Sequence, residues 1–330
     1  MSGHILDSDK NTTLPGRSRR RGPHGDPSPD SPPSDVAGWI RWVARRLEAA
    51  QLCHANGLQE PYLEAEYLVL HAFSIPFETK PVKRPPPPAD AEARVRRLLE
   101  RRVNQRQPAP YVTGEAFFAG HRFFVDERVL IPRSRIENIL DDPRGFSPWF
   151  PKGPPRRILD LCTGSGCLAI ALALRLPQAK VDGVDLSKGA LQVARLNRDR
   201  FGLRDRVRLI ASDLFAALGG ERYDLIVTNP PYVPRADFDA LPPEYHREPA
   251  MALVAGEDGL DLIGPILRQA SDHLNPRGVL ICETGDDVQE ILMRRWPDLP
   301  VTWLPFHFGG SGVFALTREE LEAWCRQHFP

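Results

Sequence analysis

The stretch ILDLCTGSGCLAIALA, residues 158–173, decides the fold of this chain. It opens with a short apolar run that predicts a buried β-strand. Gly164 and Gly166 follow directly, and the residues after them have the composition of a helix. Glycine lets the backbone turn sharply and come close to a ligand at the amino end of that helix, where a negative group is favoured. The stretch therefore predicts a strand, a ligand-binding loop and a helix.

The same alternation of short apolar runs with helical patterns continues through the rest of the chain. Strands are expected near residues 158–162, 180–184, 207–211, 224–228, 279–282, 301–304 and 313–316. This rhythm predicts an α/β fold, a doubly wound, mostly parallel seven-stranded sheet with helices on both faces. Ligands of such sheets bind beyond the carboxyl ends of the strands, so residues that directly follow strands are the candidate site.

Changes in composition divide the 330 residues into four parts. Residues 1–34 are rich in Pro, Ser, Gly and charge and lack apolar periodicity, which predicts a disordered tail. Apolar residues at helical spacing predict a small helical domain for substrate recognition at 35–109. A switch to period two, with Ala119-Gly120 as a turn, predicts a β-hairpin and linker at 110–155. The catalytic domain is expected at 156–330.

The distribution of charge does not indicate a nucleic acid as an obligatory partner. Lys plus Arg equal Asp plus Glu, at 43 each. A further helix is expected at 89–105, and its exposed face is expected to carry Arg94, Arg97, Arg101 and Arg102. A solvated helix face accounts for these arginines, and a local contact with RNA is the alternative.

Other features of the composition exclude several classes of protein. The five cysteines are scattered without a CxxC pair, which predicts free thiols and neither a disulfide framework nor a metal site. No apolar run approaches the roughly 18 residues of a membrane span, and the first residues have no apolar core of the kind found in a secretory signal, so neither is expected. Arginines at 17–21 resemble a transit peptide, but aspartates interrupt that pattern. We expect a cytoplasmic protein that binds neither DNA nor membrane.

The glycine loop and the strand before it supply the first candidate cofactor contacts. They are Asp160, Thr163, Gly164, Ser165 and Gly166. The glycines alone do not identify the ligand, because NAD-dependent enzymes use glycine at the same turn and Ala169 is a permitted variant of the third glycine. Asp160 can brace the loop or accept the ammonium group of a cofactor.

Two further acidic residues follow consecutive predicted strands. Asp185 ends the second strand, 19 residues after Gly166, where its carboxylate can accept both ribose hydroxyls of a nucleoside. Asp213 ends the third strand and can accept from an adenine amino group, while Leu214 or Phe215 packs on the ring. Either aspartate can also be a turn or cap residue. Their placement after consecutive strands favours a nucleoside site.

The fourth predicted strand ends in Asn229-Pro230-Pro231-Tyr232. Proline fixes φ and has no N–H, so the carbonyl groups here are rigid acceptors. The side-chain oxygen of Asn229 and the Pro230 carbonyl can accept both N–H groups of an amide or amino nitrogen and aim it at a methyl sulfonium. Tyr232 offers a flat face. A proline-rich turn without chemistry is the structural alternative.

This tetrapeptide suits methyl transfer to a delocalised nitrogen. An amide nitrogen is a poor nucleophile, and hydrogen bonds accepted from its protons raise its electron density as the methyl group moves. The transition state is then stabilised more than the ground state. The proton can leave after transfer, so neither a strong base nor a metal is required. We therefore interpret Asn229, Pro230, Pro231 and Tyr232 as the catalytic residues.

With these motifs the chain resembles a known family, the protein glutamine methyltransferases, over roughly residues 36–325. The segment 114–134, with Cys162 and Cys167, is similar to the ribosomal branch, which modifies a glutamine of the third protein of the large ribosomal subunit. The release-factor branch usually has Gly where Cys162 stands. It also has a Pro-Glu-Thr-Glu-like sequence where residues 134–137 here read Ser-Arg-Ile-Glu.

The resemblance implies a cofactor, a partner and a set of site residues. The cofactor is S-adenosylmethionine, and the partner is a ribosomal large-subunit protein, methylated before or during assembly. Residues that line the cofactor site by resemblance are Gly164, Gly166, Asp185, Leu214 and Asn229. The family's aromatic residue beside adenine is here Leu214.

Three alternatives stay open from the sequence. The same reaction on a peptide chain release factor is the nearest. An adenine or cytosine NH2 presents the same two donors, so an amino methyltransferase of nucleic acid is the second, although no target-recognition insertion is evident. A module that binds the cofactor or a ribosomal partner without catalysis is the third.

Overall fold

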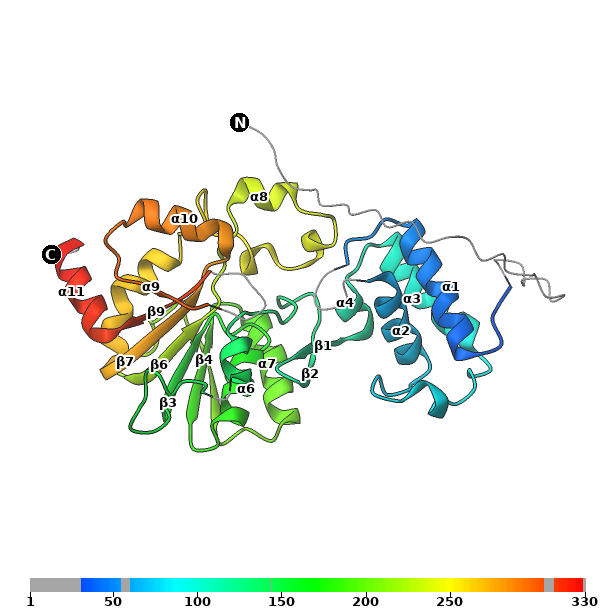
Figure 1. Cartoon of the computed structure of the whole chain (residues 1–330), viewed down its shortest axis with the longest axis horizontal. Coiled ribbons are helices and arrows are strands. Elements are labelled where there is room, and N and C mark those ends of the chain that lie inside the picture. The colour runs from blue at the N-terminus through cyan, green and yellow to red at the C-terminus, as the bar shows by residue number, and fades with distance from the viewer. Residues whose placement is uncertain (1–30, 55–59, 143, 306–311, 329–330) are drawn as a thin grey trace, which may run out of the picture.

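The computed structural model describes residues 31–54, 60–142, 144–305 and 312–328. Most of the tail expected at 1–34 lies outside these residues. None of the described helices combines the length and the apolar character needed to cross a bilayer. Figure 1 shows a sheet flanked by helices, a smaller helical unit, and a hairpin between them.

A seven-stranded sheet forms the centre of the C-terminal part, in the order β5-β4-β3-β6-β7-β9-β8. The strands are β3 (Arg157–Leu161), β4 (Lys180–Asp185), β5 (Val207–Ala211), β6 (Tyr223–Thr228), β7 (Leu274–Glu283), β8 (Thr302–Trp303) and β9 (Val313–Thr317). The first five in this order are parallel, β9 is antiparallel to β7, and β8 is antiparallel to β9. The predicted α/β, doubly wound, mostly parallel sheet is confirmed. Its order reverses between β3 and β6, where such sheets bind ligands.

Helices cover both faces of this sheet (Figure 1). They are α5 (Glu137–Asp141), α6 (Cys167–Arg175), α7 (Lys188–Arg200), α9 (Ile263–Ala270), α10 (Asp286–Arg295) and α11 (Arg318–His328). The connection between β6 and α9 contains α8 (Arg235–Ala240) and the single turns η3 (Tyr245–Arg247) and η4 (Ala250–Ala252), and the single turn η5 (Ser271–His273) follows α9. Successive residues of a strand point to opposite faces. Ile158 therefore packs in the core under α6, and Leu159 packs in the core under α9, α10 and α11.

The helical unit has a hydrophobic core of its own. Its elements are α1 (Val36–Ala49), α2 (Pro61–Ala72), η1 (Pro81–Lys83), α3 (Ala91–Leu99), a π turn η2 (Glu100–Asn104) and α4 (Ala109–Thr113). Asp35 caps α1 by accepting from the Gly38 N–H at 2.6 Å. Trp39 and Trp42 of α1 meet edge to face at 5.3 Å between ring centroids, which gives this small core much of its buried area.

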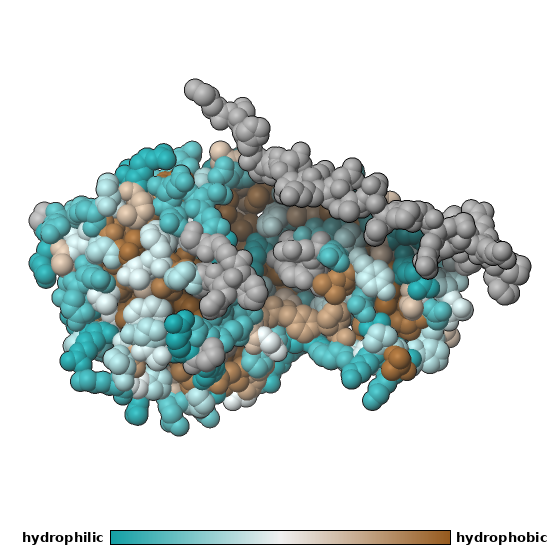
Figure 2. Space-filling view, viewed as in Figure 1, coloured by the Kyte–Doolittle hydropathy of each residue, from teal (hydrophilic) through white to brown (hydrophobic). Residues whose placement is uncertain are grey.

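The predicted hairpin joins the two units. It consists of β1 (Glu115–Phe118) and β2 (His121–Phe124), with positive φ at Ala119 and Gly120, as a tight two-residue turn requires. Asn197 of α7 fixes it to the sheet unit: the Phe124 N–H donates to Asn197 Oδ1 at 2.7 Å, and Asn197 Nδ2 donates to the Phe124 carbonyl at 3.0 Å. In Figure 2 the surface is hollowed between the two units, and hydrophobic side chains lie in that hollow.

One expectation for the helix at 89–105 is wrong. Arg102 is not on an exposed face but is 1% exposed, because the π turn directs it inward to Glu64 of α2. Arg101 is also turned inward, and its guanidinium donates to the carbonyls of Tyr111 and Val112 at 2.8 Å. Of the four arginines, Arg97 is exposed and Arg94 is partly buried.

Candidate active site

A cavity lies at the carboxyl ends of β3, β4, β5 and β6, where the sheet order reverses. Its lining comes from four loops that are distant in sequence. The lining residues that the sequence predicted for the cofactor or for catalysis are Gly164, Asp185, Asp213, Leu214, Asn229 and Pro231. The structure thus brings half of the predicted candidates together in this cavity. The cavity is also lined by Cys162 and by residues 128–130, which the sequence singled out only through the family resemblance, and by Pro249, Met251 and Ala252, which carried no signal in the sequence.

Asp185 is held rigidly in this cavity by backbone groups. Its Oδ2 accepts from the Gly164 N–H at 2.8 Å and its Oδ1 accepts from the Ser187 N–H at 2.8 Å. Burial raises the pKa of this carboxyl, and the two N–H groups oppose that rise. Each carboxylate oxygen has two lone pairs, so one on each stays available for the paired hydroxyls of a ribose.

The other loop candidates lie behind the cavity wall. Asp160 is buried, and its Oδ2 accepts from the Thr163 hydroxyl at 2.5 Å and from the Ala169 N–H at 3.0 Å. Burial raises the pKa of Asp160 to about 7. Thr163 and Ser165 are buried, and Gly166 begins α6 in the left-handed region. These contacts correspond to the bracing role that the sequence left open for Asp160.

Two neighbouring residues after β5 have different surroundings. Leu214 lines the cavity, with a positive φ of 44°. Phe215 is buried in the core under α9 and stacks on His273 at 4.7 Å between ring centroids. The alternative in which Phe215 packs on an adenine ring in the cavity is therefore wrong, since its ring is buried in the core and does not line the cavity.

Asn229 lines two cavities, as do Leu130 and Ala252. It lines the cavity described above, which we call the cofactor-side cavity. It also lines a second cavity, whose other lining residues include Pro230, Tyr232 and Tyr245. Its Nδ2 donates to the Arg133 carbonyl at 3.0 Å, whereas its Oδ1 is buried and has no partner. A carbonyl can only accept, so this bond fixes which way the amide points. A buried acceptor without a donor is costly, and a ligand donor is the simplest account of it.

Tyr232 lines the second cavity and rests against two glycines. A Cβ on Gly285, whose φ is +71°, would lie 2.9 Å from Tyr232 Cε2, and one on Gly259, whose φ is +79°, would lie 2.3 Å from the Tyr232 carbonyl oxygen. Both positions therefore require glycine. Burial raises the pKa of Tyr232 to about 12, so this phenol is neutral at physiological pH and presents a flat, uncharged face.

Sequence reasoning missed several residues around Asn229. Arg133, Glu248, Gly259 and Gly285 come from three separate segments, and only the fold brings them to the tetrapeptide. A glycine directly after an acidic turn, as at 256–259, was the one available signal for Gly259, because such turns often need a positive φ.

Comparisons with known proteins identify several proteins similar to this chain. The family model described as methyltransferase small domain matches residues 146–241. A ribosomal protein uL3 glutamine methyltransferase of Bordetella pertussis is 45% identical over 285 residues, covering 86% of this chain and 94% of its own length. One of Xanthomonas campestris is also 45% identical, covering 86% and 91%. A solved methyltransferase from Pyrococcus furiosus is 19% identical, with a TM-score of 0.42, and covers 69% of this chain and 98% of its own.

Proposed function

This chain belongs to the family of ribosomal protein uL3 glutamine methyltransferases, and we propose that Asn229 presents the amide of a glutamine in that ribosomal protein for methylation. The enzyme takes its methyl group from S-adenosylmethionine, as methyltransferases of this fold do. When bound, this cofactor supplies an electrophilic methyl group on a sulfonium. The Oδ1 of Asn229 is the observation that carries the proposal, since this buried oxygen lacks an N–H donor and Asn229 lines both cavities.

The residues of the first cavity fit the cofactor. The free lone pairs of Asp185 suit the two ribose hydroxyls, and the apolar Leu214 suits one face of adenine. Asp213, on the exposed rim, suits the adenine amino group. Asp160, Thr163, Ser165 and Gly166 shape the glycine loop from behind.

Methyl transfer then depends on two rigid acceptors. We assign one N–H of the acceptor glutamine to Asn229 Oδ1 and the other to the Pro230 carbonyl, with Pro231 keeping the turn stiff and the ring of Tyr232 against the amide plane. Hydrogen bonds accepted from both N–H groups raise the electron density on the amide nitrogen as the new N–C bond forms. The neutral Tyr232 does not act as a base, and the proton leaves to solvent after transfer.

The acceptor glutamine enters through the second cavity. Its lining includes Arg133, Tyr245 and Asp287, a mixture of charge and aromatic surface that suits a polypeptide. An extended segment fits such a site better than a folded one, so we place methylation of the ribosomal protein before or during assembly, in the cytoplasm. The helical unit borders the hollow in Figure 2 and is our candidate for recognition of the substrate protein. A contact of Arg97 with RNA stays a prediction.

The experiment is a comparison of acceptors. Purified enzyme with methyl-labelled S-adenosylmethionine is given undermethylated uL3, a release factor or DNA, and labelled residues are located by mass spectrometry. Label on a glutamine of uL3 supports the proposal. Label on the release factor alone would move the substrate to the sister branch, and label on DNA alone would overturn a protein substrate.

A further inference from the structure

Two buried glutamates lie beyond the tetrapeptide, at the two ends of the single turn η3. Glu244 precedes the turn and Glu248 follows it, and each is 4% exposed. The Glu248 N–H donates to the Tyr245 carbonyl at 3.1 Å, so the turn is closed and short. Buried carboxylates are costly unless they are paired, and the partners of these two belong to different parts of the molecule.

Glu248 joins two walls of the cofactor-side cavity. Its Oε2 accepts from the Ile131 N–H at 2.9 Å, and Arg133 Nη1 donates to its Oε1 and Oε2 at 2.8 and 3.0 Å. Leu130 directly precedes Ile131, and Pro249 directly follows Glu248. Both Leu130 and Pro249 line the cavity. The carboxylate therefore fixes the segment whose Arg133 carbonyl accepts from Asn229.

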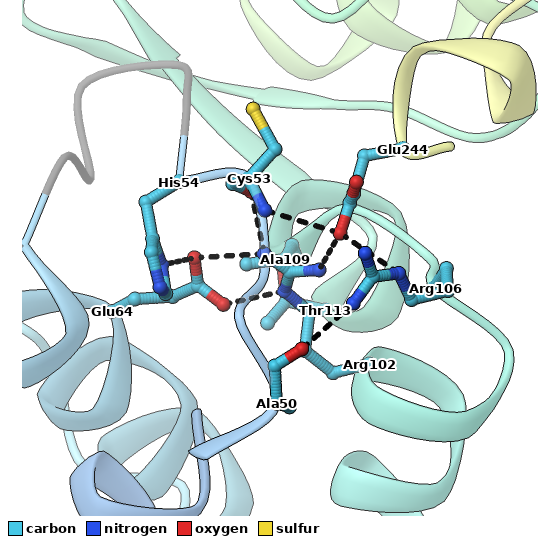
Figure 3. Close-up of polar contacts among 9 residues, drawn as sticks. All are labelled: Ala50, Cys53, His54, Glu64, Arg102, Arg106, Ala109, Thr113 and Glu244. Atoms are coloured by element: carbon cyan, nitrogen blue, oxygen red, sulfur yellow. Dashed lines mark hydrogen bonds and ion pairs between the residues drawn. The ribbon is translucent and has the colours of Figure 1, made fainter. Parts of the chain in front are cut away.

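Glu244 reaches the helical unit instead. Its Oε1 accepts from the Cys53 N–H at 3.2 Å and lies 3.4 Å from Arg102 Nη1 and 3.3 Å from Arg106 Nε. Figure 3 shows this carboxylate entering a cluster whose other members all come from the helical unit.

The partner arginine of Glu244 is itself locked in place. Arg102 Nε donates to Glu64 Oε1 at 2.5 Å, and its Nη2 donates to the Cys53 carbonyl at 2.8 Å. His54 Nδ1 lies 2.8 Å from Glu64 Oε2 on the far side. The helical unit thus presents a preformed socket for one carboxylate of the sheet unit, which explains why Arg102 is buried.

We propose that Glu248 is a positioning residue for methyl transfer, which orients the Asn229 amide through Arg133, and that Glu244 anchors the same turn to the helical unit. Docking of the helical unit and the orientation of Asn229 are therefore coupled through η3. Asn229 needs this support because its Oδ1 must meet an incoming N–H without rearrangement. The inference rests on the proposed role of Asn229.

The first test replaces Glu248 by glutamine, which keeps the volume but removes the charge and one acceptor. We expect the kcat of E248Q to fall about 10- to 100-fold, while the Kd of S-adenosylmethionine changes less than about threefold. The control is E221Q, which breaks a carboxylate–arginine pair with Arg157 and Arg208 at the edge of the sheet remote from the site and should leave kcat unchanged. An unchanged kcat in E248Q would overturn the inference.

A double-mutant cycle separates positioning from general destabilisation. If Glu248 acts through Asn229, E248Q has no further effect on the single-turnover rate once Asn229 is alanine. Losses that multiply in the double variant would mean that Glu248 acts by another route. An N229A enzyme with wild-type activity would instead refute the proposed function itself, so the two failures are distinguishable.

E244Q provides a second variant if E248Q unfolds. Its arginine partner keeps Glu64, so we expect the protein to stay folded and kcat on the protein substrate to fall about three- to tenfold with the Kd of the cofactor unchanged. A variant that weakens cofactor binding and leaves kcat intact would contradict coupling through η3.

Discussion

Asn229 and Arg133 are 96 residues apart in sequence, and the side-chain amide of the first donates to the backbone carbonyl of the second at 3.0 Å. This hydrogen bond uses the NH2 group of Asn229, which can only donate. It leaves the side-chain oxygen of Asn229 free to accept a hydrogen bond. Asn229 lines two cavities, and in our proposal the cofactor binds in one and the acceptor amide in the other.

Asp185 is predicted to govern cofactor affinity. In D185N one oxygen becomes an NH2 group, which cannot accept from Gly164 or Ser187 or from a ribose hydroxyl. We expect the Kd of S-adenosylmethionine by titration calorimetry to rise about 10-fold or more, with a smaller change of kcat at saturation. D213N, at the exposed rim, is the comparison and should change Kd less. Equal effects of the two substitutions would contradict the assignment.

Gly285 is predicted to be required for the seat of Tyr232. Alanine there meets the ring at 2.9 Å, whereas alanine at Gly120, which has the same φ of +71°, meets nothing within 4 Å. G120A should lower the free energy of unfolding by about 1 kcal/mol through backbone strain alone. G285A should lower the free energy of unfolding by more than G120A does, and it should also raise the KM for the protein substrate. Identical losses in denaturant unfolding, with KM unchanged in both, would mean that the ring contact is unimportant.

Cys162 is predicted to carry backbone strain at the cofactor-side cavity. Its φ is +59°, a region that glycine adopts freely, and it lines the cavity that Asp185 and Leu214 also line. C162G should keep cofactor binding and lose no stability. C162V should lose about 1 to 2 kcal/mol, because a branched Cβ is disfavoured at this φ. Thermal unfolding with and without cofactor measures the stability and the cofactor binding of each variant. A C162V enzyme as stable as the wild type would show that the backbone at Cys162 is not strained.

Glu283 is predicted to make stability depend on pH. Burial raises the pKa of this carboxyl to about 7, although it accepts from the Ser134 hydroxyl and the Arg135 N–H. The folded state therefore binds its proton more tightly than the unfolded state. The contribution of Glu283 to the free energy of unfolding is greatest below pH 4.5. It decreases as the pH rises towards 7, and the total decrease is up to about 3 kcal/mol.

E283Q removes that titration. Its free energy of unfolding should fall less than that of the wild type between pH 5 and about pH 8, the remaining slope coming in part from Asp160, whose pKa burial also raises to about 7. Denaturant unfolding across this range measures the difference. Parallel curves for the two proteins would show that Glu283 does not titrate in the folded state.

Local patterns were sufficient to predict much of this molecule. The seven strands and the hairpin turn at Ala119-Gly120 each follow from a few consecutive residues, and so does the placement of Asp185 after its strand. Strand order then brings the loops together without further information.

What the sequence did not reveal depends on contacts between distant residues. The burial of Arg102 requires Glu64 and Glu244, 38 and 142 residues away, and a basic helix face looks solvated until those carboxylates are placed. Phe215 and Leu214 differ only in which side of the loop they face. Asn229 contacts Arg133, and Arg133 contacts Glu248. These three residues come from separate segments, so no local sequence pattern predicts their contacts.

The most direct test of the central claim is the N229A variant, measured for cofactor binding and for methyl transfer to uL3 in parallel. If Oδ1 of Asn229 holds the acceptor amide, the single-turnover rate falls about 100- to 1000-fold, while the Kd of S-adenosylmethionine and the melting temperature change little. A variant that methylates uL3 at the wild-type rate, or that loses activity only because it no longer binds the cofactor, would contradict the account.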